Sequence, residues 1–416
     1  MEIFILCILI SFVVGDRILE GTRLKRHREQ IPIRIHVNGS RGKSSVTRLI
    51  AGALRGGGIS AIAKTTGTTP RIIYEDGSET PLYRLGKANI KEQFHVLGLA
   101  AQRNPDAIVI ECMALQPRLQ AMSEHRIIHS TIGVITNCRE DHLDVMGPTE
   151  RHVAQALAGT TPAGQTLVTA ESQHLDILKH ACQELECNLE VVATDDLEAI
   201  SNAEMARFGY YEHRENVAVA LRVAKLCGVS REDAMVGMLN ATPDVGALRM
   251  YDLEFFGRQI CFVHGFAAND PQSSHHIWEL SHRVFPEYSR RIMLLNLRTD
   301  RGDRSRQLGE AITTWATQPD FVVLMGTGTR IAARELLKKG FLPGQIVFSE
   351  GTSARDVFER IVELVDQRAL VVGLGNVADP GLALVGLFRN RGVQIPMSQL
   401  YPTTPPEAQP PEVANG

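Results

Sequence analysis

The sequence predicts an α/β protein that consists of a parallel-sheet domain and a second, smaller α/β domain of Rossmann-like type. Apolar, β-branched runs alternate with amphipathic helical patterns along most of the chain, which is the order of a parallel sheet covered by helices on both faces. At 416 residues the chain is too long for one ordinary core. A breaker cluster at 242–246 interrupts the alternation, so we expect one domain over residues 33–245 and the other over residues 246–400.

Each expected strand is a short run rich in valine, isoleucine and leucine between turn or helix signals. In the first domain these runs are residues 33–37, 107–110, 132–135, 166–168 and 189–192. In the second domain they are residues 260–263, 291–295, 321–324, 345–348 and 369–372.

The two ends of the chain differ from the rest. Residues 3–14 are apolar except for Ser11, and basic residues follow up to Arg28. We expect residues 1–19 to be a single-pass anchor in the cell membrane, followed by a basic linker over residues 20–32 that keeps the catalytic domains cytoplasmic. A helix docked on the protein surface is the alternative. Residues 401–416 are rich in proline, which is typical of a disordered tail.

The overall composition excludes some classes of function. The formal net charge of −3 gives no electrostatic reason to expect a nucleic-acid partner. The seven cysteines contain no C-x-x-C pair, which indicates reduced thiols and neither a disulfide framework nor a zinc site.

A phosphate-binding loop is predicted directly after the first strand. The loop residues are Gly39, Ser40, Arg41, Gly42, Lys43, Ser44 and Ser45, and a helical pattern follows them. In such a loop, backbone N–H groups and the helix N-terminus face the phosphates of ATP. Lys43 would reach the β- and γ-phosphate oxygens, and the Ser44 hydroxyl would bind Mg²⁺. An ordinary glycine turn before a helix is the alternative.

Polar side chains follow other strands of the same predicted sheet. Glu111 ends one strand, and His142 comes shortly after another, among three acidic residues. Because the carboxyl ends of parallel strands meet in one crevice, we expect both side chains to bind Mg²⁺ there. Thr66 and Thr68 offer hydroxyls to a substrate or to Mg²⁺, unless they belong to a plain polar turn.

The second domain contains an arginine-rich loop after the run 291–295. Arg298, Arg301 and Arg304 lie close together there, and guanidinium groups bind carboxylates in a bidentate manner. These residues are candidate substrate ligands. A solvated loop in which Asp300 and Asp303 pair with the arginines is the alternative.

Together these motifs resemble the Mur ligase superfamily of ATP-dependent amide ligases. The likeness lies in G-x-x-G-K-S, the strand-end Glu111, and T-N-x-x-x-D-H-x-D beginning at Thr136. It implies catalytic roles for Lys43, Glu111, His142 and an inter-domain Arg249. It also implies nucleotide contacts from Asn216 on a closing helix, and from Asn269 and Asp270 on the ribose side.

The chain is most similar to one branch, the membrane-anchored catalytic subunits of poly-γ-glutamate synthase. The shared stretches include residues 64–68, 111–114, 144–149 and 265–270. The resemblance implies a ligase that polymerises glutamate through γ-amide bonds via an acyl phosphate, with ATP and Mg²⁺, releasing ADP and phosphate. Glutamate, the growing polymer, membrane lipid and companion membrane subunits would be its partners, and a homo-oligomer stays open.

Two departures from the superfamily limit this resemblance. The phosphate loop comes almost at once, so we expect no domain for a nucleotide-sugar substrate. No lysine occurs between Lys91 and Lys179, so the carbamylated lysine that many Mur ligases use is absent. Two alternative functions remain: a membrane-tethered P-loop ATPase or switch without ligase activity, and a ligase like folylpolyglutamate synthase.

Overall fold

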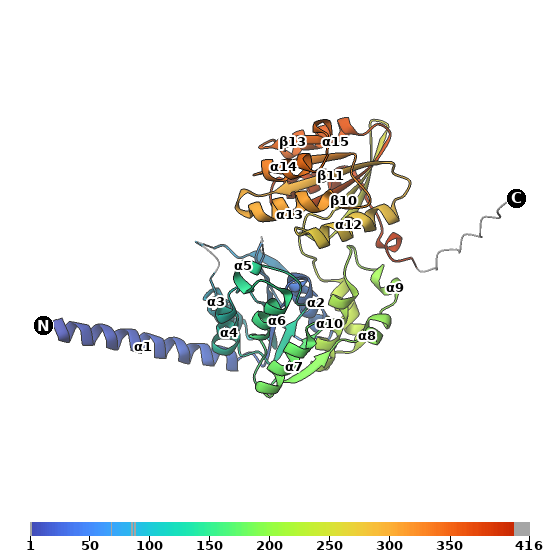
Figure 1. Cartoon of the computed structure of the whole chain (residues 1–416). Coiled ribbons are helices and arrows are strands. Elements are labelled where there is room, and N and C mark those ends of the chain that lie inside the picture. Colours follow the sequence, from blue (N-terminus) through green and yellow to red (C-terminus); the bar gives the residue numbers. More distant parts are fainter. Residues whose placement is uncertain (1, 68, 85, 87–88, 403–416) are drawn as a thin grey trace. The chain divides into compact units, whose positions relative to one another are not determined.

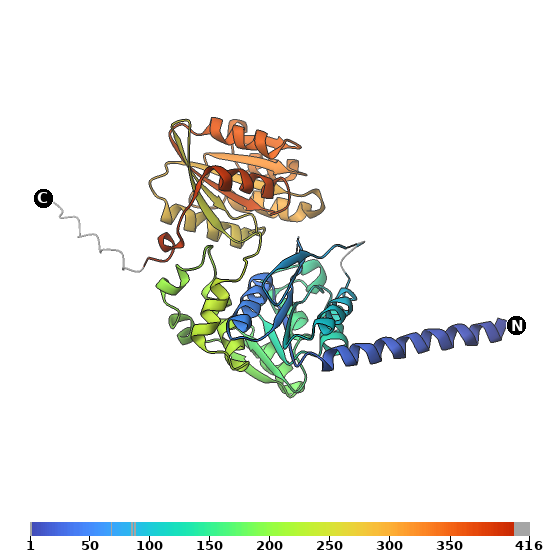
Figure 2. The ribbon, with the colours of Figure 1, turned by 180° about the vertical axis from the view of Figure 1, so that it is seen from behind.

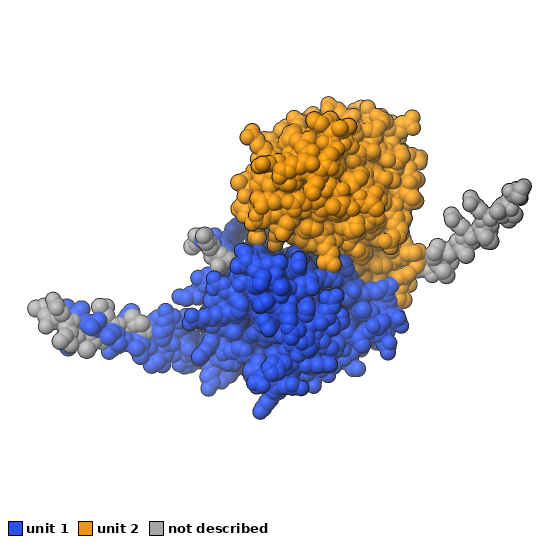
Figure 3. Space-filling model, in the orientation of Figure 1, with its two compact units in different colours: residues 1–200, 213–244 blue, residues 201–212, 245–416 orange. Residues whose placement is uncertain are grey.

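The computed structural model describes residues 2–67, 69–84, 86 and 89–402. It divides into two compact units (Figure 3): unit 1 comprises residues 1–200 and 213–244, and unit 2 comprises residues 201–212 and 245–416. Residues 201–212, which the sequence groups with the first domain, therefore cluster with the second. Thr68 and most of the expected proline-rich tail lie outside the described residues.

Unit 1 is built on an eight-stranded sheet with the strand order β4-β3-β2-β5-β1-β6-β7-β8. The five strands expected from the sequence are confirmed within one residue or so at their ends, because β-branched residues fill them. The strands are β1 (Ile33–Asn38), β2 (Ala61–Lys64), β3 (Arg71–Ile73), β4 (Glu79–Pro81), β5 (Ala107–Glu111), β6 (Ile132–Ile135), β7 (Thr166–Thr169) and β8 (Asn188–Val191).

The sheet of unit 1 is mixed, which corrects the expectation of a purely parallel one. Strands β2, β5, β1, β6, β7 and β8 are parallel, whereas β3 and β4 form an antiparallel extension at one edge. The parallel strands bring the carboxyl ends of β2, β5, β1 and β6 to one edge of the sheet.

Helices cover both faces of this sheet, as Figures 1 and 2 show from opposite sides. Apolar side chains of α3, of the π-helix η1 and of α6 pack on one face. Helix α2 packs against α10 and α11 on the other. The helices are α1 (Glu2–Glu29), α2 (Lys43–Gly56), α3 (Glu92–Arg103), α4 (Pro117–Met122), η1 (Ser123–Ile128), α5 (Leu143–Met146), α6 (Glu150–Ala158), α7 (Leu175–Glu184), α8 (Thr194–Glu198), α10 (Arg214–Leu226) and α11 (Arg231–Leu239).

The N-terminal segment forms one helix, α1, that includes most of the residues expected to be a linker. Its second half is docked on unit 1: Leu24 is buried in the core, and Arg28 donates hydrogen bonds to the carbonyls of Arg126 and Ile127. Among the described residues, no helix combines the length and apolarity needed to cross a bilayer. The expected membrane-spanning helix is thus not supported, since Asp16 and Arg17 interrupt the apolar run.

Unit 2 is built on a seven-stranded sheet with the order β13-β12-β11-β14-β10-β9-β15. Its five expected strands are confirmed. The strands are β9 (Arg249–Phe255), β10 (Arg258–His264), β11 (Arg290–Leu297), β12 (Phe321–Gly326), β13 (Ile346–Glu350), β14 (Arg368–Gly375) and β15 (Val393–Gln394). The helical segments are α9 (Asn202–Met205), α12 (Pro271–Val284), η2 (Thr299–Arg301), α13 (Gly302–Ile312), α14 (Arg330–Lys338), η3 (Pro343–Gln345), α15 (Ala354–Leu364), α16 (Gly381–Arg391) and η4 (Met397–Gln399).

An antiparallel hairpin, which the sequence analysis does not anticipate, distinguishes unit 2 from a purely parallel Rossmann-like sheet. Strands β9 and β10 are antiparallel and join through Phe256 and Gly257, both of which have positive φ. Such a two-residue turn matches the twist of a hairpin. The alternating pattern of residues 249–255 before this turn is the signal that could have identified β9.

Candidate active site

The residues of the predicted phosphate loop form a tight turn between β1 and α2 of unit 1. Gly39 and Gly42 have φ values of 133° and 82°, which favour glycine. A Cβ atom at Gly39 would collide with Oγ1 of Thr136, and one at Gly42 would lie 2.7 Å from Oδ1 of Asn216. Asn216, the expected nucleotide ligand on α10, therefore lies against the loop.

The two residues after β6 hold the loop in place. The backbone N–H of Ser40 donates to the carbonyl of Asn137 over 2.9 Å, and that of Arg41 donates to Asn137 Oδ1 over 3.1 Å. Thr136 Oγ1 donates to the Arg41 carbonyl over 2.6 Å. The Thr-Asn pair of the sequence motif is thus a brace for the phosphate loop, a role that the motif alone does not reveal.

Lys43 begins α2 and folds back over the loop. Its ammonium donates hydrogen bonds to the carbonyls of Gly39 and Ser40, the latter over 3.2 Å. A cation is thereby placed directly at the turn whose N–H groups would face phosphates. Ser45, in the first turn of the same helix, is half-buried.

Three elements bring oxygen atoms together beside the loop. Oε2 of Glu111, at the end of β5, accepts a hydrogen bond from Ser44 Oγ over 2.9 Å and one from the backbone N–H of Thr66 over 2.7 Å. The other carboxylate oxygen accepts from Thr66 Oγ1 over 2.6 Å. Glu111 is only 2% exposed, so this carboxylate is fixed. Hydroxyl and carboxylate oxygens are the donors that Mg²⁺ prefers.

His142 lies in the loop after β6, where it precedes α5 in the left-handed region at φ 44°. Asp141 Oδ1 is 3.9 Å from His142 Nε2 and 3.7 Å from Nη2 of Arg41. These contacts connect His142 with the phosphate loop through Asp141. Among the described residues, no group of three or more histidine, cysteine or acidic side chains could hold a metal ion. A metal role for His142 stays a prediction.

A buried lysine supports the strand end next to Glu111. Lys64 is fully buried, its ammonium is 2.7 Å from Glu92 Oε1, and Arg84 binds the same carboxylate through two nitrogens. Burial lowers the pKa of Lys64 from its ordinary value, although Glu92 opposes this effect. Lys64, which forms this buried ion pair, is thus only two residues away from Thr66, which binds Glu111. No local sequence pattern marks the pair.

A second buried ion pair joins β1 to η1. Nδ1 of His36 is 2.8 Å from Oε2 of Glu124, and Nε2 is 3.3 Å from Oγ of Ser123, which itself donates to Gln93. Burial alone would lower the pKa of His36, but Cys112 and Glu124 raise it to about 9. The raised pKa favours the imidazolium form of His36, which lies three residues before the phosphate loop begins. No local sequence pattern marks this pair.

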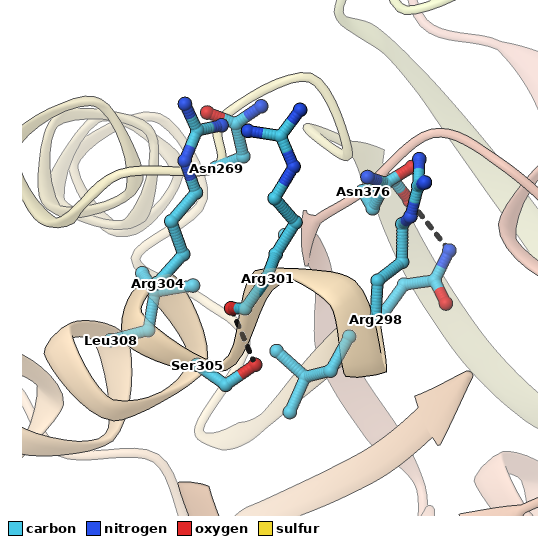
Figure 4. A pocket seen from close by; sticks show the side chains of 10 residues that line it. Asn269, Arg298, Arg301, Arg304, Ser305, Leu308 and Asn376 are labelled. Carbon is cyan, nitrogen blue, oxygen red and sulfur yellow. Dashed lines mark hydrogen bonds between the residues drawn. The ribbon is translucent and has the colours of Figure 1, made fainter. Parts of the chain in front are cut away.

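The arginine-rich loop of unit 2 lines a small pocket at the ends of β11 and β14 (Figure 4). Arg298, Arg301 and Arg304 contribute to its wall together with Asn269 and Asn376. Arg298 binds Asp300 through two nitrogens, and this contact holds the pKa of Asp300 below its usual range. The Arg298–Asp300 contact is therefore one of the arginine–aspartate pairs expected for a solvated loop. All three arginines nevertheless line the pocket.

The remaining candidates of unit 2 occupy element ends. Asp270 caps α12 by accepting a hydrogen bond from the Ser273 N–H over 2.9 Å. Arg249 is the first residue of β9, where it pairs with His264 of β10. Their expected roles toward a nucleotide stay predictions.

Two family descriptions match this chain. "Mur ligase middle domain" matches residues 37–226, and "Poly-gamma-glutamate synthase CapB C-terminal domain" matches residues 250–391. The first match includes the phosphate loop, Glu111 and His142, and the second includes the arginine-lined pocket.

Two characterised proteins are similar over nearly the whole chain. "Capsule biosynthesis protein CapB" of Bacillus anthracis is 37% identical over 389 residues, which cover 93% of this chain and 82% of that protein. "PGA synthase CapB" of Bacillus subtilis (strain 168) is 34% identical over 380 residues, which cover 91% of this chain and 95% of that protein.

Solved structures with the same fold are distant in sequence. A bifunctional folylpolyglutamate synthase/dihydrofolate synthase of Yersinia pestis, complexed with AMPPNP and Mn ion, has a TM-score of 0.64 at 14% identity, over 88% of this chain and 93% of that chain. FolC of E. coli, in complex with DHPP and ADP, has a TM-score of 0.63 at 15% identity, over 89% of this chain and 91% of that one. At such low identity these likenesses concern the fold alone.

Proposed function

This chain belongs to the CapB family of poly-γ-glutamate synthases, with a Mur ligase middle domain, and we propose how its own residues carry out that synthesis. It is an ATP-dependent amide ligase that makes poly-γ-glutamate. The observation that carries our assignment of the site is the fixed contact of Ser44, Thr66 and Glu111 beside the phosphate loop.

A nucleotide would be held by the loop between β1 and α2. The N–H groups of residues 39–45 and the start of α2 would face the phosphates, and Asn216 lies against Gly42 on the same side. We assign Ser44 and Glu111 to Mg²⁺, because hard oxygen donors fit this ion. His142, which the family resemblance implies, would be a further ligand through a ring nitrogen. When bound, Mg²⁺ supplies charge neutralisation at the transferring phosphoryl group.

Activation of a carboxylate is the first chemical task. The γ-carboxylate of glutamate attacks the γ-phosphorus of ATP, the bond to the β-phosphate oxygen breaks, and ADP leaves. Lys43 would offset the charge that spreads over the transferring group, and Arg249 is proposed to do so as well. The amine of a second glutamate then attacks the acyl phosphate carbon, loses a proton and expels phosphate, which yields a γ-amide.

The arginine-lined pocket of unit 2 is proposed to bind a glutamate carboxylate. Arg301 and Arg304 present guanidinium groups beside Asn269 in Figure 4, and such groups hold carboxylates in a bidentate manner. Thr66 is proposed as a further substrate contact, because it lies at Glu111 beside the phosphate loop.

The N-terminal helix is proposed to attach the enzyme to the cell membrane, with both units on the cytoplasmic side. Phe4, Leu6, Ile10 and Phe12 of α1 are more than half exposed, which supports contact with lipid or with companion membrane subunits. Deletion of residues 1–19 should release the protein from a membrane pellet in high salt. A truncated protein that still pellets would contradict this attachment.

Product analysis tests the reaction. With ATP, Mg²⁺ and glutamate, we expect ADP and phosphate, and added hydroxylamine should trap the acyl phosphate as a hydroxamate. AMP and pyrophosphate would contradict the mechanism, because adenylation requires attack at the α-phosphorus. ADP release that does not depend on glutamate would instead favour a P-loop switch, and dependence on a pteroate acceptor would favour a folylpolyglutamate synthase activity.

A further inference from the structure

A row of three cations lies along helix α14, outside the pocket described above. Arg330, Arg334 and Lys338 follow one another at intervals of four residues, from the first residue of the helix to the last. Residues four apart face the same side of a helix and are separated by about 6 Å along its axis. The three side chains therefore form a single row of positive charge.

The row of α14 borders a shallow groove with an apolar floor. The groove is lined by these three residues together with Ala333, Leu337 and Phe348. Phe348 belongs to β13, the edge strand of the unit 2 sheet, and Figure 1 labels β13 next to α14. Leu337 is 43% exposed and Phe348 is 50% exposed, so apolar side chains separate the cations from the sheet edge.

Local physics does not favour this arrangement of charges. Like charges four residues apart repel one another, and a cation at the first residue of a helix opposes the helix dipole. Among the described residues, neither Arg330 nor Arg334 has an ion pair within 4.0 Å. Lys338 contacts Glu335, which also attracts Arg334, and Glu350 attracts Arg330 while it accepts from the N–H groups of Gly328 and Thr329, so two carboxylates face three cations. A ligand with several negative charges would relieve the repulsion.

The row begins next to the arginine-lined pocket within unit 2. The N–H of Thr299, in the segment that carries Arg301, donates to Oγ1 of Thr327 over 3.0 Å. A Cβ atom at Gly302 would lie 3.1 Å from the side chain of Ile331, the neighbour of Arg330. Helices α13 and α14 also pack against each other. A chain molecule with one end in the pocket could therefore continue along α14.

We propose that the groove between α14 and β13 binds the growing γ-linked glutamate chain, an inference that rests on the proposed function. A γ-linked residue contributes five backbone bonds, so an extended chain presents one carboxylate about every 6 Å, which is the spacing of the cations. Its two methylene groups per residue would contact Leu337 and Phe348. The polymer thus matches both the charges and the apolar floor of the groove.

The test is the binding of a fluorescently labelled γ-linked glutamate decamer to the full chain, measured by anisotropy at low salt. Replacing Arg330, Arg334 and Lys338 together by Gln should weaken binding at least tenfold, and Phe348→Ser should weaken it about threefold. The matched control replaces Arg355, Arg368 and Arg389 by Gln, which changes the net charge equally at exposed positions outside the groove. Its affinity should stay within twofold of the parent.

Several results would overturn the proposal that this groove binds the polymer. These are a parent protein that does not bind the decamer, a groove variant that binds as well as the parent, and equal losses in both triple variants. A decamer whose carboxylates are amidated, or free glutamate, should not compete, and competition by either would also overturn it. In the synthesis reaction, the groove variant should make shorter chains at equal ADP release.

This binding measurement is independent of catalysis. A parent protein that binds the decamer but forms no γ-amide would contradict the proposed function, whereas the proposal that the groove binds the polymer would still hold. A parent protein that forms polymer while the groove variant binds and elongates normally would contradict only the groove.

Discussion

The two units present their functional groups at strand ends in opposite ways. In unit 1, Glu111 is buried and receives three hydrogen bonds from Ser44 and Thr66. In unit 2, the pocket arginines have long side chains that come from η2, the residue before it and the start of α13, and the side chain of Arg298 is 39% exposed. One site is rigid and filled by its own contacts, whereas the other is open and cationic.

The roles that we propose for the two sites make different physical demands. Phosphoryl transfer requires donors and charges that are fixed before the reaction, because reorganisation at the moment of transfer would raise the barrier. Recognition of carboxylates, by contrast, needs a strong local charge and a planar donor, and a guanidinium supplies both even on a flexible stem. We therefore expect substitutions in unit 1 to abolish chemistry and those in unit 2 to change substrate affinity.

The largest effect should come from the phosphate loop. Lys43→Ala should lower ATP turnover by about 10⁴-fold, because a transferring phosphoryl group loses its nearest fixed cation. The fold should persist, since the ammonium contacts only the carbonyls of Gly39 and Ser40. Lys225→Ala, an exposed position in the same unit, is the control for both turnover and melting temperature. Near-normal turnover in a folded Lys43→Ala protein would refute the loop assignment.

The largest effect on the free energy of unfolding should come from the buried His36–Glu124 pair, which joins β1 to η1. Glu124→Gln should cost about 3 kcal/mol at neutral pH, because it removes the carboxylate partner of the buried His36 ring and leaves Cys112 beside it. His36 has a raised pKa, so its contribution is complete below pH 6.5 and is lost as the pH rises through about 9.

Denaturant titrations from pH 6 to pH 10 measure this contribution. The free energy of unfolding of the parent protein should decline across that range, and the decline should be much smaller in Glu124→Gln. A parent curve that is flat between pH 6.5 and pH 9 would show that His36 is neutral. Glu79→Gln removes the partner of the buried Arg48 and serves as the comparison at another buried ion pair of unit 1.

An intermediate effect is expected at the strand-end carboxylate. Glu111→Gln keeps the side-chain size and one acceptor oxygen but removes the negative charge, so turnover should fall by about 10²-fold and the Mg²⁺ requirement should rise. Turnover measured over a series of Mg²⁺ concentrations tests this, with the exposed Glu232→Gln as control. If only stability changes and the Mg²⁺ requirement does not, then Glu111 is a structural residue.

The smallest effect should arise in unit 2. Arg301→Ala should raise the KM for glutamate about tenfold and leave the KM for ATP unchanged, because one carboxylate contact is lost. Arg306→Ala, on the following helix α13 and outside the pocket, should change neither constant. An equal rise in both KM values for Arg301→Ala would place its effect on the nucleotide and contradict the separation of tasks between the units.

The sequence by itself determines most of the framework. Runs of β-branched residues specify ten strands correctly, and the glycines at 39 and 42 specify the turn between β1 and α2. Ser230, a residue type typical of helix N-caps, accepts a hydrogen bond from the Asp233 N–H at the start of α11. These signals are local, since each depends on residues that are close together along the chain.

Only the tertiary structure decides which distant residues meet. Thr66 and Glu111 are 45 positions apart, and His36 and Glu124 are 88 positions apart. Their contacts depend on the strand order β2-β5-β1-β6 and on the packing of η1 against β1, and no short sequence pattern encodes these. The same holds for residues 201–212, which leave their sequence neighbours and join unit 2 because Asn202, Gly209 and Glu212 form hydrogen bonds with residues 394–402.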